Sequence, residues 1–231
     1  MTKKTSLMKN NQNTRPIEVV LFDLDGTLVD TAALILASFR YATQKVLGYS
    51  PPDEQLTDMV GIPLDYQMRV ISPKHADELV RVYREHNSIV HDELIKYFPG
   101  TREALDTLQA EGMRMAVVTS KRREVAARGL SRFNLSDYFE LVIGSNDTDK
   151  HKPDPEPLLL AAERMSVSAD QTIYLGDSPY DMEAARAAGS IAVAALWGMF
   201  SRERLRAADA QMELTQIEEL PNLVRNLNRI C

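Results

Sequence analysis

The sequence predicts an α/β protein in which a doubly wound parallel sheet carries a small, all-helical domain inserted after its first strand. Residues 17–22 are apolar or β-branched except for Glu18, which suits a buried parallel strand and is too short for a helix. Residues 31–97 show helical patterns without a convincing strand. Beyond residue 98, short apolar runs alternate with helical segments, which is typical of a parallel sheet with helices on both faces.

The expected elements follow from the apolar spacing and from the glycines and prolines that bound helices. Gly48 ends the first helix, Pro73 begins the longest one, and Gly112 and Gly189 end two later ones. We expect helices at residues 31–47, 53–60, 64–70, 73–95, 101–110, 122–130, 156–165, 179–188 and 216–226. We expect strands at residues 17–22, 113–118, 141–143, 172–175 and 191–195.

These elements divide the chain into three parts. Residues 1–16 form a polar tail, residues 17–30 and 98–231 form the α/β core, and residues 31–97 form the helical domain. The connections between core and helical domain are expected near residues 30–31 and 97–99. If the two parts move relative to each other, these connections are the hinges.

Composition and charge limit the possible partners. The 231 residues are 44% hydrophobic and 26% charged, which fits an ordinary globular protein, and the net charge of −6 argues against nucleic-acid binding. The single cysteine, Cys231, is the last residue, so no internal disulfide can form and a reducing cytoplasm is expected. Residues 1–16 have no apolar segment like that of a signal peptide, and no run approaches about 18 apolar residues, so we expect no membrane anchor.

Four polar side chains are expected at one edge of the sheet. Asp23, Thr119, Lys152 and Asp177 lie at the ends of predicted strands or in the loops that follow. Because these ends form the ligand-binding edge of a doubly wound sheet, the four side chains should converge. The first strand ends in DLDGT (residues 23–27), which places two carboxylates two positions apart before a glycine that permits a sharp turn. An ordinary Asp-Gly turn is the alternative, and the apolar strand before it argues against that.

This set of residues suits cleavage of a phosphate ester. When Asp23 attacks an anionic phosphate, like charges at about 4 Å repel by roughly 4 kcal/mol at an effective dielectric of about 20. A divalent metal held by Asp23, by an oxygen near Asp25 and by Asp177 would offset that repulsion, and Mg²⁺ suits such all-oxygen ligation. Asp23 would then form an aspartyl-phosphate, one of the known covalent carboxylate intermediates.

The remaining polar residues have roles in the same reaction. Lys152 would supply a second positive charge and Thr119 a hydroxyl donor to a phosphoryl oxygen. Asp25 can protonate the leaving oxygen and later activate water, since the two half-reactions need opposite proton transfers. Taken singly, each residue has a simpler interpretation: Thr119 and Ser120 would cap the following helix, and Lys152 would be a solvated charge in its loop.

Four segments, in this order, resemble the motifs of the haloacid dehalogenase-like (HAD) hydrolase superfamily. They are DLDGT (23–27), TS (119–120), KPDP (152–155) and GDSPYD (176–181), and the resemblance spans about residues 17–224. It implies a Rossmann-like core with an α-helical cap, Asp23 as nucleophile and Asp25 as acid/base. It also implies that the metal is bound by Asp23, Asp177 and the backbone carbonyl of Asp25. Thr119 and Lys152 would hold the transferring phosphoryl group, and Asp181 would support the metal site or Lys152.

Further residues separate the branches of this superfamily. The dehalogenases lack an aspartate at the position that matches Asp25, so the presence of Asp25 argues for phosphoryl transfer. Ile35 and Leu64 stand where the β-phosphoglucomutases carry a histidine and an arginine, and residues 48–70 contain no lysine for the Schiff base of the phosphonatases. What remains resembles the phosphoglycolate phosphatase branch. The cap segments GIPLDYQM and YREHNSIVHDELIKYFPGTREAL resemble the pyrophosphatases of that branch.

The resemblance therefore implies a Mg²⁺-dependent phosphatase acting on a small phosphomonoester such as phosphoglycolate, and the cysteine content leads us to expect it in the cytoplasm. Inorganic pyrophosphate is the alternative substrate, and a β-phosphoglucomutase-like isomerase or a non-catalytic binding protein is less favoured. We expect a monomer or a homodimer without nucleic-acid or membrane partners. The expected substrate-binding residues are Gly26, Thr27, Gly61, Ile62, Thr119, Ser120 and Lys152.

Overall fold

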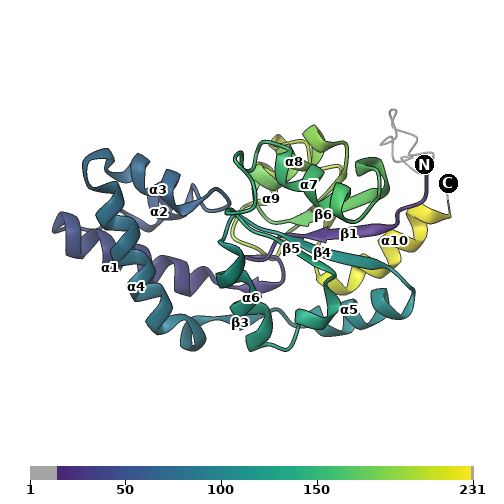
Figure 1. Ribbon diagram of the computed structural model, residues 1–231, viewed down its shortest axis with the longest axis horizontal. Coiled ribbons are helices and arrows are strands. Elements are labelled where there is room, and N and C mark those ends of the chain that lie inside the picture. Colours follow the sequence, from purple (N-terminus) through teal and green to yellow (C-terminus); the bar gives the residue numbers. More distant parts are fainter. Residues whose placement is uncertain (1–14, 230–231) are drawn as a thin grey trace, which may run out of the picture.

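The computed structural model describes residues 15–229, and its centre is a six-stranded sheet of order β5-β4-β1-β6-β7-β8 (Figure 1). Each neighbouring pair of strands in this sheet is parallel. The strands are β1 (Val19–Phe22), β4 (Arg114–Val118), β5 (Leu141–Ile143), β6 (Thr172–Gly176), β7 (Ile191–Ala195) and β8 (Met212–Leu214). The predicted α/β fold with a doubly wound parallel sheet is confirmed.

Helices cover both faces of this sheet because successive strand residues point to opposite sides. Val20 and Phe22 of β1 pack with α5 (Thr101–Ala110), α6 (Arg123–Arg132) and α10 (Leu220–Asn228). Val19 and Leu21 point the other way and pack with α7 (Glu156–Arg164), α8 (Pro179–Ala188) and α9 (Arg202–Ala207). β1 is therefore buried on both faces, and its carboxyl end is held in the middle of the sheet edge.

A helical lobe lies beside the sheet (Figure 1). It is built from α1 (Ala32–Leu47), α2 (Asp53–Thr57), α3 (Leu64–Ile71), the 3₁₀ turn η1 (Pro73–His75) and α4 (Ala76–Leu94). α1 and α4 lie side by side, and the rings of Phe39 and Tyr83 meet edge to face with centroids 5.0 Å apart. The helical cap expected from the sequence is present, while its division from the core at residues 31 and 97 stays a prediction.

A two-stranded antiparallel ribbon joins the points where the chain enters and leaves this lobe. β2 (Val29–Asp30) pairs with β3 (Lys96–Tyr97), with Val29 opposite Tyr97 and Asp30 opposite Lys96. The expectation that residues 31–97 contain no strand is therefore wrong at residues 96–97. β3 is two residues long and exposed, so it has no hydrophobic period, and its pairing with β2 alone defines it.

Other boundaries also differ from the sequence-based expectations. The predicted strand at 17–22 begins two residues later, and the predicted helix at 73–95 starts with a 3₁₀ turn. The sequence reasoning missed α9 and β8; β8 is a three-residue edge strand whose central residue, Glu213, faces two arginines. The predicted tail at 1–16 lies almost wholly outside the described residues, as does Cys231.

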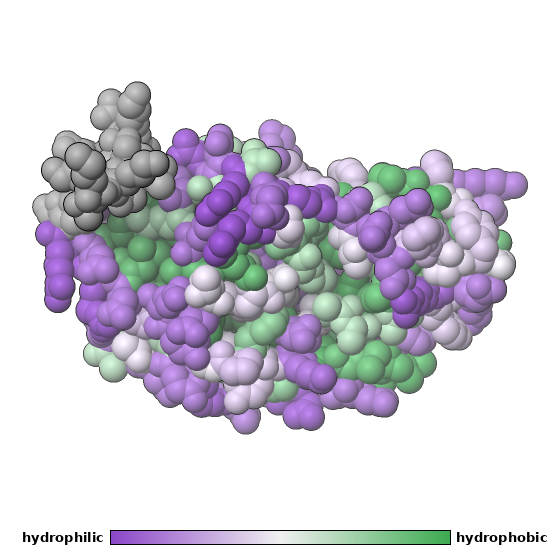
Figure 2. Space-filling model, turned by 180° about the vertical axis from the view of Figure 1, so that it is seen from behind, coloured by the Kyte–Doolittle hydropathy of each residue, from purple (hydrophilic) through white to green (hydrophobic). Residues whose placement is uncertain are grey.

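The surface is polar over most of the face seen in Figure 2, on the sheet domain as well as on the helical lobe. Among residues 15–229, none of the helices is both long enough and apolar enough to cross a lipid bilayer.

Candidate active site

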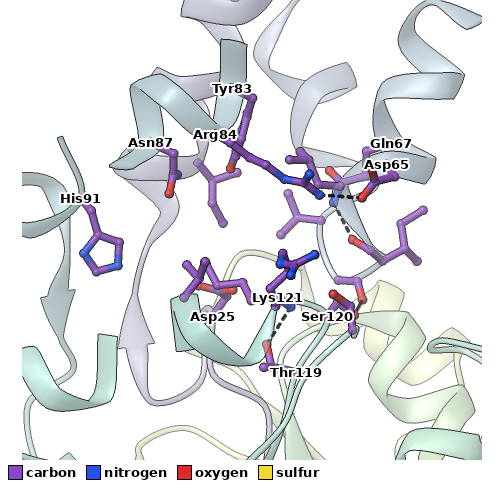
Figure 3. Close-up of a pocket in the computed structure, with 18 of the residues that line it drawn as sticks. Asp25, Asp65, Gln67, Tyr83, Arg84, Asn87, His91, Thr119, Ser120 and Lys121 are labelled. Carbon is purple, nitrogen blue, oxygen red and sulfur yellow. Dashed lines mark hydrogen bonds and ion pairs between the residues drawn. The ribbon is translucent and has the colours of Figure 1, made fainter. Parts of the chain in front are cut away.

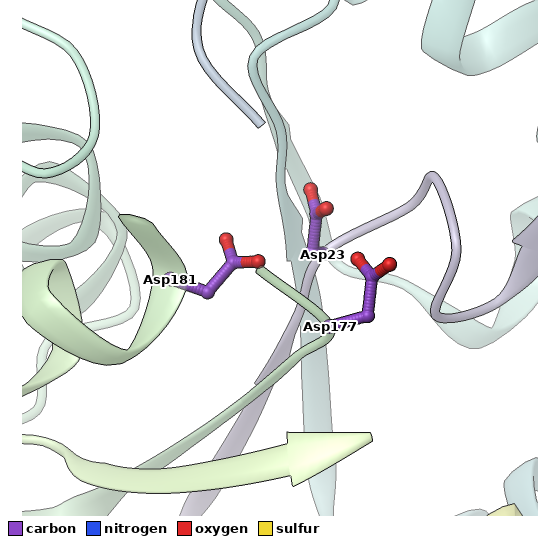
Figure 4. Close-up of side chains that lie close together, drawn as sticks. All are labelled: Asp23, Asp177 and Asp181. Carbon is purple, nitrogen blue, oxygen red and sulfur yellow. The ribbon is translucent and has the colours of Figure 1, made fainter. Parts of the chain in front are cut away.

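Three buried carboxylates meet at the carboxyl edge of the sheet. Asp23 follows β1, Asp177 follows β6, and Asp181 lies in the first turn of α8. Each offers an oxygen, and these oxygens lie within 4.8 Å of one another (Figure 4). All three residues are at most 3% exposed. The expected convergence of Asp23 and Asp177 is therefore observed, and the second acidic position of the GDSPYD motif joins them.

One buried ammonium lies against this carboxylate cluster. Nζ of Lys152 donates to Oδ1 of Asp23 at 3.0 Å, to Oδ1 of Asp181 at 2.6 Å and to the hydroxyl of Tyr174 at 2.8 Å. Because an ammonium has three hydrogens, these contacts use its full donor capacity. Lys152 thus neutralises carboxylates directly and is not a solvated loop charge.

Asp181 is fully engaged by the protein itself. Its Oδ1 accepts from Lys152 and from Tyr174 at 3.1 Å, and its Oδ2 accepts from the backbone N–H of Ser178 at 2.9 Å and the hydroxyl of Ser178 at 2.6 Å. The hydroxyl of Ser178 accepts a hydrogen bond from the backbone N–H of Asp181, and the Asp181 side chain accepts one from the backbone N–H of Ser178. These reciprocal bonds form a capping box at the start of α8. Asp181 is therefore placed to orient Lys152.

Burial controls the proton affinities in this cluster. It raises the pKa of Asp23 to about 7; Lys152 opposes this rise, and Asp181 and Asp25 add to it. Burial also raises the pKa of Asp177 well above its usual value, with Asp181 and Asp23 adding to the effect. Burial alone would lower the pKa of Lys152, but Asp181 and Asp23 outweigh it and hold the pKa above its usual value.

The donor set fits a divalent cation. Three buried carboxylates face one ammonium, so negative charge is in excess. Within residues 15–229, Asp177 accepts one hydrogen bond, from the backbone N–H of Met199 at 2.8 Å, and it has no ion-pair partner. Hard divalent cations prefer such oxygen ligands. Asp23 and Asp177 are the side chains best able to hold one, because both oxygens of Asp181 are already occupied.

Two glycines allow the backbone to approach Asp177 closely. A Cβ on Gly26 would lie 2.1 Å from Oδ2 of Asp177, and a Cβ on Gly198 would lie 2.3 Å from the same oxygen. Gly26 also has a φ of +73°, which side-chain-bearing residues rarely adopt. The glycine of the DLDGT segment is therefore required both by its turn and by the carboxylate packed against it.

Asp25 has two partners on one oxygen. The hydroxyl of Thr31 donates to Oδ1 at 2.5 Å, and the ammonium of Lys121 forms an ion pair with the same atom. Both members of this pair are largely buried, with the Asp25 side chain 13% and the Lys121 side chain 16% exposed. Sequence reasoning missed Thr31 and Lys121. The signal for Lys121 was its place directly after Thr119-Ser120, at the end of a strand.

A pocket of about 670 Å³ separates the sheet edge from the helical lobe. Figure 3 shows Thr119, Ser120, Lys121 and Asp25 on the sheet side, with Tyr83 and Asn87 of α4 across from them. The lobe also contributes apolar wall residues, namely Ile35, Phe39, Val60, Ile62 and Leu64. The lobe also contributes polar side chains, among them Gln67, Arg84 and Asn87, so the pocket suits a small polar molecule whose reacting group lies at the carboxylate end.

The loop around Gly61 closes one side of the pocket. The hydroxyl of Ser120 donates to the carbonyl of Gly61 at 2.5 Å, and the side-chain amide of Gln67 donates to the carbonyl of Ile62 at 2.6 Å. Gly61 has a φ of +110°, and a Cβ there would lie 2.7 Å from the hydroxyl of Ser178. The lobe therefore contacts the core directly beside the carboxylate cluster.

The expected site residues fall into two layers. Seven line the pocket: Asp23, Asp25, Gly61, Ile62, Thr119, Ser120 and Asp177. The others, Gly26, Thr27, Lys152 and Asp181, pack behind it. Thr27 is fully buried, and its hydroxyl has no hydrogen-bond partner within the described residues. The catalytic and substrate-binding roles assigned to these residues stay predictions.

Known proteins resemble this chain over most of its length. Residues 20–195 match the family of haloacid dehalogenase-like hydrolases. The protein named "Putative pyrophosphatase PpaX" from Caldanaerobacter subterraneus is 39% identical over 209 residues, covering 90% of this chain and 95% of that protein. Pyrophosphatase PpaX of Halalkalibacterium halodurans is 31% identical over 208 residues, covering 90% and 97%. The crystal structure of "a predicted phosphatase from Clostridium acetobutylicum" has a TM-score of 0.83 at 26% identity, covering 92% and 100%.

Proposed function

The chain belongs to the haloacid dehalogenase-like hydrolase family and is a phosphatase, and we propose that it hydrolyses inorganic pyrophosphate with Mg²⁺ through an aspartyl-phosphate on Asp23. The observation that carries the proposal is the buried carboxylate cluster, in which Asp23 lies between Lys152 and Asp177 at the sheet edge. Relatives that are 31% and 39% identical have pyrophosphatase names, which supports the choice of substrate. A small phosphomonoester such as phosphoglycolate is the second candidate, because it too joins a phosphate to a second anionic group.

In the proposed reaction, one oxygen of Asp23 attacks the phosphorus and the bond to the leaving oxygen breaks. Mg²⁺ held by Asp23, Asp177 and the backbone carbonyl of Asp25 would offset the negative charge of the phosphate. Thr119 donates a hydrogen bond to a phosphoryl oxygen, and Asp25 gives its proton to the leaving oxygen. Asp25 enters the first step with this proton on Oδ2, since Thr31 and Lys121 both contact Oδ1. Asp25 then takes a proton from water as that water attacks the phosphorus, which releases phosphate, restores the Asp23 carboxylate and returns Asp25 to its protonated form.

Lys152 and Asp181 serve this reaction from behind the pocket. Lys152 holds Oδ1 of Asp23 and favours its ionised, nucleophilic form against the effect of burial. Asp181 holds Lys152 in turn, and Ser178 holds Asp181. This chain of contacts keeps the Asp23 carboxylate oriented before the substrate arrives.

The helical lobe would exclude water and select the substrate. Its contacts with the core, at Ser120 and Gly61, lie next to the reacting groups, and the β2–β3 ribbon is the expected hinge. The segment at residues 61–66 places the apolar side chains of Ile62 and Leu64 against the pocket, which suits a small leaving group.

Phosphate release from a panel of substrates tests the proposal. The panel holds pyrophosphate, phosphoglycolate, nucleotides and sugar phosphates, each assayed with Mg²⁺ and with EDTA, and Asp23→Asn serves as control. We expect Mg²⁺-dependent release with pyrophosphate as the best substrate and kcat/KM in the range of about 10⁴ to 10⁸ M⁻¹s⁻¹. Phosphoglycolate as the best substrate would support the second candidate. No release from any member would overturn both.

A further inference from the structure

Lys121 is the one cationic side chain lining the pocket, within the described residues, that is largely buried. Its side chain is 16% exposed, whereas those of Arg84, Arg122 and Arg128 are 41% to 51% exposed. Those arginines pair with acidic side chains at the rim, namely Asp65, Glu124 and Asp92. Because buried charges are screened least, an anion inside the pocket interacts most strongly with Lys121.

The position of Lys121 is fixed by its backbone. Its N–H donates to the hydroxyl of Thr119 at 3.2 Å, and its carbonyl accepts from the N–H of Ser145 at 2.8 Å. A Cβ on Gly144 would lie 2.9 Å from that carbonyl, so the neighbouring loop packs tightly against it. The side chain therefore starts from a rigid loop and reaches into the pocket next to Asp25 (Figure 3).

The two buried lysines differ in their donor use. Lys152 donates its three hydrogens to Asp23, Tyr174 and Asp181. Lys121 has one hydrogen-bond partner within residues 15–229, which is Oδ1 of Asp25. Two of its three hydrogens are therefore available, although the group is largely buried and lines the pocket. An anion in the pocket could accept these hydrogens, and a hydrogen bond between two charged groups is stronger than one between neutral groups.

Lys121 also lies on the side of the pocket where the leaving group must be. In the proposed function, on which this inference rests, Asp25 faces the leaving oxygen. Lys121 contacts Asp25, so a leaving group that takes its proton from Asp25 would lie within reach of the two remaining hydrogens of Lys121.

We propose that Lys121 determines substrate specificity by binding a second anionic group on the leaving portion of the substrate. The substrate class is a phosphate joined by a short link to another anion, as in pyrophosphate or phosphoglycolate. The ammonium bridges that anion and Asp25, so the charge of the leaving group is neutralised beside the residue that protonates it. A neutral leaving group gains nothing from this contact.

Lys121→Met tests the proposal because it keeps an unbranched side chain only one atom shorter and removes the charge. kcat/KM is measured for pyrophosphate, phosphoglycolate and phenyl phosphate, whose leaving group has no second anion. We expect the preference for either doubly anionic substrate over phenyl phosphate to fall by roughly 10- to 100-fold, the loss typical of a charged hydrogen bond. If kcat/KM falls by the same factor for all three substrates, the proposal is overturned.

Thr31→Val is the matched control. It removes the other hydrogen bond to Oδ1 of Asp25 without changing any charge. We expect Thr31→Val to slow all three substrates by a similar factor, so that their ratio stays near that of the wild type. A similar loss of preference in Thr31→Val would show that the position of Asp25, and not the charge of Lys121, sets the specificity.

Inhibition of the wild-type enzyme tests the same point if Lys121→Met does not fold. With phenyl phosphate as the reporter substrate, the inhibition constant of methylenebisphosphonate should be at least about tenfold lower than that of methylphosphonate. Equal inhibition constants would contradict the proposal. The failure of the proposed function is distinguishable, since it would appear as absent phosphate release from the doubly anionic substrates in the wild type itself. If the wild type prefers the doubly anionic substrates and Lys121→Met keeps this preference, the inference about Lys121 is overturned while the proposed function stands.

Discussion

The ammonium of Lys152 lies 3.0 Å from Oδ1 of Asp23, although 129 positions separate the two residues in the chain. The two side chains are 1% and 5% exposed, so this ion pair is out of contact with bulk water. The same ammonium lies 2.6 Å from Asp181. It is the one cation among three buried carboxylates within the described residues, and it holds the predicted nucleophile in place.

Lys152→Met should therefore destabilise the protein strongly. It leaves the buried carboxylates without their ammonium, and breaking a buried ion pair in this way costs about 3–5 kcal/mol. Urea unfolding measures the change, and Lys150→Met is the matched control. Lys150 lies two residues earlier, is 69% exposed and pairs with Asp154, so its loss should cost less than about 1 kcal/mol. Equal free energies of unfolding for the two variants would contradict the buried network.

Asp23→Asn should abolish turnover and leave the fold intact. The carboxamide has the same shape but cannot form an aspartyl-phosphate, so kcat should fall on the order of 10⁴-fold or more. Because one of three buried negative charges is removed, the melting temperature in EDTA should not fall. Phosphate release at the wild-type rate by this variant would exclude Asp23 as the nucleophile.

Asp25→Asn tests the acid/base role. Loss of a general acid/base group slows a reaction on the order of 10² to 10⁴-fold, and we expect kcat to fall within that range. The fall should be larger for substrates whose leaving oxygen is strongly basic, because these depend most on a proton from Asp25. A variant whose rate and leaving-group dependence match the wild type would remove Asp25 from the mechanism.

The sequence predicted the parts of the site that follow strands. Asp23, Thr119 and Asp177 each come directly after a buried, apolar strand, and the parallel order of the sheet alone brings such ends together. The α/β fold and the helical lobe follow from equally strong signals, since their hydrophobic periods extend over many residues.

The parts that escaped prediction depend on contacts between distant segments. The Lys121–Asp25 pair joins residues 96 positions apart, and the place of Lys121 after a strand indicates the sheet edge but not the side chain that it contacts there. β3 and β8 are two and three residues long, too short for a period, and only their pairing partners define them as strands. Asp181 was expected to support the metal site or Lys152, and its contacts with Lys152 and Ser178 favour the second role.

Metal binding should be visible in stability as well as in activity. A cation bound at the carboxylate cluster stabilises the folded state by about 2.7 kcal/mol at one hundred times its dissociation constant. Mg²⁺ should therefore raise the melting temperature, and EDTA should reverse the rise and stop phosphate release. Asp177→Asn should lose most of this response, whereas Asp154→Asn, which alters a carboxylate outside the cluster, should keep it. A melting temperature independent of Mg²⁺ would place the metal elsewhere or exclude it.

Gly61→Ala should impair the contact between helical lobe and core. Gly61 has a φ of +110°, and the new Cβ would lie 2.7 Å from the hydroxyl of Ser178, which Asp181 holds in place. Gly48→Ala is the matched control, because Gly48 has a φ of +80° but a Cβ there would have no neighbouring atom within 4 Å. Both variants carry backbone strain, commonly about 1–3 kcal/mol, so their difference reports the collision beside the pocket.

We expect Gly61→Ala to lower kcat/KM by about tenfold or more, since each 1.4 kcal/mol of hindered closure corresponds to about a factor of ten. Gly48→Ala should leave kcat/KM within about twofold of the wild type, because Gly48 lies at the end of α1 and does not line the pocket. Melting temperatures of both variants separate loss of closure from loss of folding. If the two variants have the same kcat/KM, the close approach of Gly61 to Ser178 is not needed for turnover, and closure must depend on the other contacts between lobe and core.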